Sequence, residues 1–248
     1  MVAAQKGRTL MQPVIIEGET SIGAGVNIPN ILALTANAAS RPYIRSPFAA
    51  RGKLIAVQSA LGLLIDMDYG SKNVVTQSVC RVAATMQDPY DVINENWYPN
   101  EGDQLALRVA NPTAGALTLR WRIVLFPVDQ LLPDSRVYQS QASIAAGTVS
   151  QQLLDGTRYE RPPAPSYLTV FMSASATGLL RQLQIDTDLI SPPAAVNPTN
   201  QIPQDPLDTT IEGVEVEEDK LQSLSVSNPT GGALTVFFKQ VLTELVRT

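Results

Sequence analysis

The sequence contains no histidine and only one cysteine among its 248 residues. Histidine is the commonest general base and metal ligand near neutral pH, so Ser-His-Asp sites, Cys-His sites and His-based zinc sites are excluded within one chain. Cys80 has no second thiol for an intrachain disulfide, and its alternating surroundings predict a small buried apolar side chain. The sequence therefore indicates a protein that is not an enzyme, with no catalytic, cofactor-binding or metal-binding residue.

Charged residues are also few, at 17% of the chain, and the net charge is -5. A chain of this charge has no basic field for nucleic acid. The charge is uneven: residues 1–53 carry an excess of four positive charges, whereas residues 205–219 carry seven acidic side chains and no basic one. We interpret residues 205–219 as a solvated loop and strand rim rather than a cation site, because the spacing of a calcium-binding loop is absent.

Long apolar runs are missing as well. No run approaches the ~20 residues that a membrane span needs, and the N-terminus lacks the layout of a secretion signal. No phosphate-binding loop sequence is present. We therefore expect a soluble protein without a transmembrane segment, made inside a cell.

The most informative positive feature is an internal repeat. Asn111–Thr118 recurs as Asn228–Thr235, 117 residues later, with seven of eight positions identical. Apolar positions on both sides of this octapeptide match too, and upstream Ile65–Asp68 resembles Ile185–Asp188. Two copies of this length nearly fill the chain, so the sequence predicts a tandem duplication.

Each copy has the pattern of β-structure. Apolar residues alternate with polar ones through 105–110 and 117–125, and the Asn-Pro-Thr-Ala-Gly between them is typical of a hairpin loop. Further strands are expected at 53–58, 61–68, 74–85, 136–144, 167–174, 179–186, 210–217 and 236–246. Proline-rich stretches such as Ser191–Pro193 are expected to be connections, and residues 88–103 an ordered loop. Amphipathic helices of ten or more residues are not expected.

Many short strands with turn signals between them indicate an all-β fold. We predict two tandem β-sandwich, jelly-roll-like domains at 41–130 and 131–248, preceded by an extended N-terminal arm at 1–40. A seven-stranded immunoglobulin-like sandwich fits the lengths nearly as well. The arm is either a frayed terminus or a segment that orders against a neighbouring subunit, with Val14, Ile15 and Ile16 adding a strand to another sheet edge.

The two copies differ on the face that points away from the core. Arg120 and Arg122 in copy one correspond to Phe237 and Lys239 in copy two. A solvated face accounts for the arginines, but an outward phenylalanine indicates a face covered by another domain or subunit. Together with Val14, Ile15 and Ile16, we take Arg120, Arg122 and Phe237 as candidate assembly residues.

Tandem β-sandwiches, a composition rich in Pro, Ala and Thr, low charge and an N-terminal arm together resemble the double (tandem) jelly-roll coat proteins of icosahedral bacteriophages. The resemblance covers about residues 41–248 and is architectural, because the octapeptide identifies no single family. It implies a capsid protein that self-assembles as a trimer of pseudo-hexameric outline into an icosahedral shell. Its partners would be itself and other virion proteins, and it would act in the virion after assembly in the host cytoplasm.

Three alternatives remain open from the sequence. One is a cement or decoration protein that clamps a shell built by another protein. Another is a phage carbohydrate- or receptor-binding β-sandwich, with Trp97 on the binding face. The third is a hydrolase that uses Asp66 with Asp68, or Asp186 with Asp188.

Overall fold

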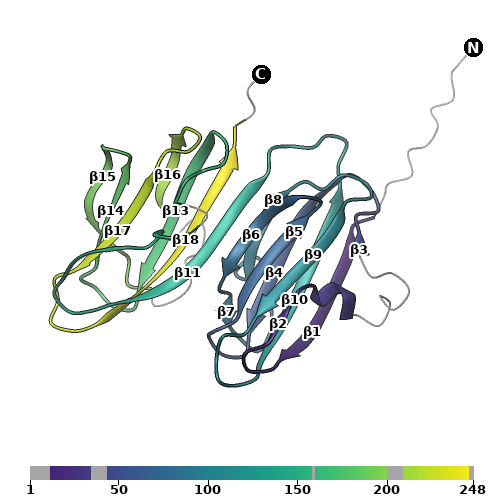
Figure 1. Ribbon diagram of the computed structural model, residues 1–248, viewed down its shortest axis with the longest axis horizontal. Coiled ribbons are helices and arrows are strands. Elements are labelled where there is room, and N and C mark those ends of the chain that lie inside the picture. Colours follow the sequence, from purple (N-terminus) through teal and green to yellow (C-terminus); the bar gives the residue numbers. More distant parts are fainter. Residues whose placement is uncertain (1–11, 35–43, 158–159, 200–208, 246–248) are drawn as a thin grey trace, which may run out of the picture.

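The computed structural model describes residues 12–34, 44–157, 160–199 and 209–245. Within these ranges the one helix is the single-turn 3₁₀ helix η1 (Ile31–Leu34), and the other regular elements are strands. Figure 1 shows two sandwiches side by side, the first built from the N-terminal half of the chain and the second from the C-terminal half. The predicted all-β class is confirmed.

The first sandwich has two sheets of four main strands. In one sheet the order is β1 (Val14–Ile22), β10 (Leu117–Pro127), β4 (Ala50–Gln58) and β8 (Val92–Trp97). In the other sheet the order is β2 (Asn27–Ile28), β9 (Gln104–Ala110), β5 (Leu64–Tyr69) and β6 (Lys72–Ser78). The short strands β3 (Ile44–Arg45) and β7 (Arg81–Val82) pair with β9 and β4.

The second sandwich repeats this arrangement strand for strand. One sheet has the order β11 (Ser135–Ile144), β18 (Leu234–Glu244), β13 (Ser166–Ala174) and β16 (Thr209–Val216). The other has the order β12 (Thr148–Gln152), β17 (Gln222–Asn228), β14 (Leu180–Ile185) and β15 (Asp188–Ala195). Counted within each sandwich, the order is 1-8-3-6 facing 2-7-4-5. Eight strands in two such sheets form a jelly roll, so the seven-stranded immunoglobulin-like alternative does not apply.

The duplicated octapeptide makes the same turn in both jelly rolls. The Asn111 side chain donates hydrogen bonds to the carbonyls of Ile22 and Gly115 at 2.9 and 2.8 Å and accepts two from Thr113. Asn228 likewise donates to Ile144 and Gly232 at 3.0 and 2.8 Å and accepts two from Thr230. The asparagine thus closes the hairpin and ties it to the end of the first strand of its own jelly roll.

A glycine packs under this turn in both copies. Gly62 and Gly178 have φ of 140° and 120°, a region that side chains avoid, and a Cβ at either position would overlap the methyl group of Thr113 or Thr230. The glycine, the asparagine and the threonine therefore form one duplicated unit, which confirms the duplication in three dimensions.

The described part of the expected N-terminal arm is instead the first strand of the repeat. Ile22 of β1 pairs with Leu117 of β10, as Ile144 of β11 pairs with Leu234 of β18. The side chains that alternate inward along β1 include a glycine and a threonine among apolar residues, so the period-2 signal is weak there. The first jelly roll consequently begins at β1, before residue 41, whereas residues 1–11 and 35–43 lie outside the described residues.

Three local expectations were wrong. Residues 92–97, expected in a loop, form β8, whose polar side chains face the second jelly roll. Ser191–Pro193, expected in a connection, lies within β15 at a sheet edge, where a proline needs no ladder donor. Asp186 lies in the turn after β14 with φ of 50°, so it does not correspond to Asp66, which lies within β5.

Each jelly roll has its own hydrophobic core between its two sheets. In the first core the fully buried ring of Trp97 from β8 lies against Gly52 of β4, where a Cβ would overlap the indole. β4 and β8 can approach this closely because residue 52 is a glycine and has no side chain.

We expect Gly52→Ala to lower the free energy of unfolding by about 1–3 kcal/mol, because the added methyl group overpacks the core. Gly231→Ala is the matched control, since a Cβ there meets no atom within 4 Å, and we expect a change below about 0.5 kcal/mol. Urea unfolding of both variants measures the difference. Equal midpoints for the two variants would contradict this packing.

Candidate assembly surfaces

The two jelly rolls are joined through one pair of strands. β11 of the second lies beside β6 of the first in parallel orientation, with Val137 opposite Val75, so one sheet runs through both jelly rolls (Figure 1). Val137 is only 2% exposed and belongs to the core of the first jelly roll. A side chain on the outer face of one jelly roll thus completes the core of the other. We call this contact of β6 and β8 with β11 the internal joint.

Hydrogen bonds reinforce the internal joint along its length. The backbone nitrogen of Val79 donates to the Gln139 carbonyl at 2.8 Å, and the side-chain amide of Gln139 donates to the Val79 carbonyl at 2.6 Å. The backbone nitrogen of Gln139 donates to the Ser78 hydroxyl. Asn94 of β8 donates to the carbonyls of Val74 and Ser135, one from each jelly roll, at 2.9 and 2.7 Å. Buried polar groups that are satisfied in this way fix the relative position of the two jelly rolls.

Asp134 is the charged centre of the joint. Its carboxylate is 3% exposed, forms an ion pair with Lys72, and accepts hydrogen bonds from the Tyr69 hydroxyl at 2.5 Å and the Tyr98 nitrogen at 2.8 Å. All three partners belong to the first jelly roll, while Asp134 directly precedes β11. Burial, followed by the hydrogen bond to Asp134, raises the pKa of Tyr69.

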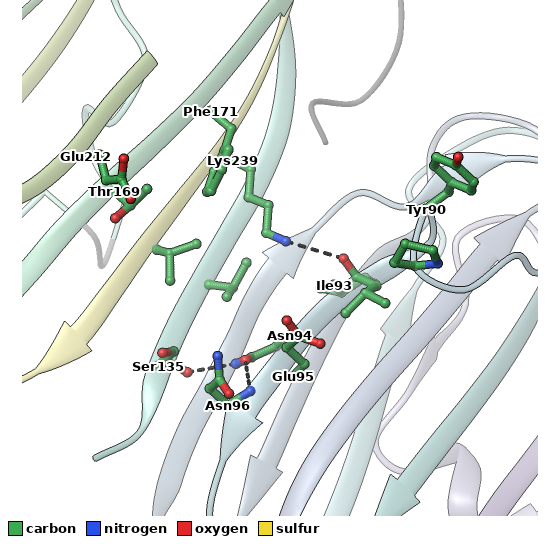
Figure 2. A pocket seen from close by; sticks show the side chains of 14 residues that line it. Tyr90, Ile93, Asn94, Glu95, Asn96, Ser135, Thr169, Phe171, Glu212 and Lys239 are labelled. Carbon is green, nitrogen blue, oxygen red and sulfur yellow. Dashed lines mark hydrogen bonds between the residues drawn. The ribbon is translucent and has the colours of Figure 1, made fainter. Parts of the chain in front are cut away.

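A cleft of about 330 Å³ opens beside the joint, between β8 of the first jelly roll and strands β13 and β18 of the second (Figure 2). Lys239 spans it: its ammonium donates to the Val92 carbonyl at 3.3 Å and lies 5.9 Å from the centre of the Phe171 ring. Among the described residues, no group of three His, Cys, Asp or Glu side chains is placed to hold a metal ion. Residues of both jelly rolls line the cleft, which is the open flank of the contact between them.

The predicted assembly residues lie on both jelly rolls and are not gathered into one site. Arg120 and Arg122 form ion pairs with Glu19 and Glu17 of β1, at 3.0 and 2.7 Å, within the same chain. Their position on the outer face is as expected, but both already have partners in their own chain, a pairing that the sequence period alone does not predict.

The apolar candidates differ in exposure. Val14 and Ile16 are partly buried against the first core, whereas Ile15 on the opposite face of β1 is 60% exposed. Phe237 is half-buried on the outer face of β18 in the second jelly roll. Sequence reasoning missed Asp134, Val137 and the other joint residues; the one local signal was an apolar side chain on the outward face of 136–144.

The structure shows the surroundings of the residues named for the alternative functions. Trp97 is fully buried in the first core, so it cannot stack on a sugar. Asp68 forms an ion pair with Arg108, and Asp186 forms one with Lys220 that holds the pKa of Asp186 below its usual range. A glycosidase acid requires a raised pKa, so this aspartate is unsuited to that role. In the part of the chain that the structure describes, no helix is long and apolar enough to cross a membrane.

We expect the free energy of unfolding to fall at alkaline pH because of the ionisation of Tyr69. Because the pKa of Tyr69 is raised above 10.0 in the folded protein, the unfolded chain loses this proton first as pH rises, and the free energy of unfolding drops above about pH 10. Tyr69→Phe removes the ionisation but keeps the ring stacked on Trp97 at 5.8 Å, so we expect a shallower decline.

Urea unfolding between about pH 9 and 11 measures the slope. Burial also raises the pKa of the Cys80 thiol, but this contribution is common to the parent and the variant and cancels in their comparison. Tyr167→Phe, at an exposed tyrosine, is the control and should keep the parent slope. The same slope for Tyr69→Phe as for the parent would contradict this role for Tyr69.

Comparisons with known proteins return structural similarities only. The chain is similar to the major capsid protein P2 of bacteriophage PM2, with 10% sequence identity and a TM-score of 0.43, over 96% of this chain and 99% of that one. It is also similar to a chain in the structure of Sulfolobus Turreted Icosahedral Virus, with 11% identity and a TM-score of 0.23, over 94% of this chain and 58% of that one. No protein-family model and no curated protein matches the sequence.

Proposed function

We propose that the chain is a virion structural protein, a capsid protein that self-assembles as a homotrimer of pseudo-hexameric outline into an icosahedral shell. The observation that carries the proposal is the row of two equivalent jelly rolls joined at their strand edges. The two strand edges that meet inside the chain each have a counterpart at one free end of the row.

Sheet edges lie open at both ends of the row, among them β1 at one end and β15 at the other. Among the described residues, β1 pairs only with β10, and β15 pairs only with β14. A contact between different surfaces of identical chains generates a ring when its rotation closes and an open filament when it does not. Closure after three chains places six jelly rolls around one axis, which is a tile of pseudo-sixfold outline.

The divergence of the outer faces supports a role in packing. The first jelly roll presents arginines that are paired with glutamates, whereas the second presents Phe237 and Lys239 at the corresponding positions. Two related domains in one chain can thus occupy similar places in a tile and meet different neighbours. We further propose that the assembled protein acts in the virion, beside other virion proteins, after assembly in the host cytoplasm.

Light scattering coupled to size-exclusion chromatography tests self-association. We expect a species of three times the chain mass that persists on dilution, because several strand edges and faces are buried together. A strictly monomeric species at high protein concentration would contradict the proposal.

Electron microscopy of the concentrated trimer separates the capsid role from a cement or decoration role. Closed shells formed by the chain alone support the capsid protein. Trimers that form no shell alone but bind a shell built by another protein would favour the decoration role.

A further inference from the structure

We propose that chains meet by repeating the internal joint: the free edge of β15 in one chain lies beside the free edge of β1 in the next copy. This inference rests on the proposed self-assembly and names the surfaces that carry it. The partner is a second copy of this chain, because each side of the contact has a counterpart inside the molecule.

β15 is the counterpart of β6. Within its own jelly roll, each is the last of four strands in a sheet and follows a six-residue strand, β14 or β5, through a tight turn. Ser191 of β15 pairs with Leu183, the fourth residue of β14, as Val75 of β6 pairs with Met67, the fourth residue of β5. The ladder irregularity that follows this pair is present in both hairpins. Ser191 therefore stands where Val75 contacts Val137 in the internal joint.

β1 is the counterpart of β11. Ile15 pairs with Val124, the eighth residue of β10, as Val137 pairs with Val241, the eighth residue of β18. Repeating the internal joint between chains therefore places Ile15 of one copy opposite Ser191 of the other.

Exposed apolar side chains occupy the positions that the internal joint buries. Val137 is 2% exposed, but its counterpart Ile15 is 60% exposed. Val74 is 1% exposed, whereas Ile190, at the same place in β15, is 38% exposed, and its neighbour Leu189 is 52% exposed. Large apolar side chains gathered at two open edges indicate surfaces that are covered in the assembly.

Charged side chains lie on both flanks of the proposed contact. In the internal joint Lys239 of β18 reaches the Val92 carbonyl of β8. Its counterpart in the first jelly roll is Arg122, and the counterpart of β8 is β16, which carries the exposed Glu212 and Glu215. The repeated joint thus brings the Arg122–Glu17 ion pair of one copy toward the acidic side chains of β16 in the next, where Arg122 can meet a second carboxylate. Charge pairs of this kind fix the register of a contact.

The prolines of β15 prevent its edge from pairing with unrelated strands. Pro192 and Pro193 have no N–H, so this edge cannot build a long backbone ladder with an arbitrary strand. The internal joint needs no such ladder, since its strands share one residue pair, Val137 with Val75. Its other hydrogen bonds are one backbone bond between Val79 and Gln139 and several that involve side chains. We expect the contact between β15 and β1 to be held in the same way, by side chains that are buried between the two strands.

Disulfide cross-linking tests the pairing. We expect a chain with both Ile15→Cys and Ser191→Cys to give covalent dimers and trimers on oxidation, and a mixture of the two single variants to give covalent dimers only. Each single variant alone should give none, and the native Cys80 is fully buried and does not compete. If light scattering shows trimers but the double variant does not cross-link, this inference is overturned while the proposed function stands. Monomers in both measurements overturn both.

A charge placed on the β15 edge gives an independent test. Ile190→Glu should abolish the trimer while the variant stays folded by circular dichroism, because the side chain is already exposed in the single chain. Val149→Glu is the matched control, since Val149 is 88% exposed on β12, at the opposite edge of the same sheet. We expect it to leave the trimer intact. A trimer that survives Ile190→Glu would rule out the β15 edge as the contact.

Discussion

The insertion of Val137 into the core of the neighbouring jelly roll is the contact on which the rest of the molecule depends. It comes from the outer face of β11, so it contributes nothing to the core of its own jelly roll. Around it Asp134, Gln139 and Asn94 satisfy the polar groups that the contact buries. A buried carboxylate is costly unless it is paired and hydrogen-bonded, and Asp134 has an ammonium, a hydroxyl and a backbone nitrogen as partners. These bonds join the two jelly rolls across a buried contact.

Duplication explains both what the two jelly rolls share and where they differ. The turn built by asparagine, threonine and glycine is the same in both, because it closes the hairpin of each sandwich and serves no neighbour. The edges and outer faces differ: β6 lies beside β11, whereas β15 pairs only with β14 among the described residues. The internal joint is permanent and holds satisfied polar groups, whereas the open edges carry exposed apolar side chains such as Ile15 and Ile190.

The sequence predicts the features that are set by local periodicity. Alternation predicted strands close to the observed β4, β10, β11, β13 and β18, and the octapeptide predicted the duplication. It did not predict β1 as part of the repeat, because Gly18 occupies an inward position there, and it did not predict β8, because Asn94 and Glu95 break the alternation. The roles of Asp134 and Val137 depend on contacts between residues about sixty positions apart, which no local pattern contains.

A map of the assembled oligomer from electron cryomicroscopy, at a resolution where strands can be traced, tests the account most directly. We expect six jelly rolls around one axis, with β15 of each chain beside β1 of the next and the same spacing at internal and intermolecular joints. An oligomer in which chains meet through two-fold related faces, with β1 and β15 both in solvent, would contradict it.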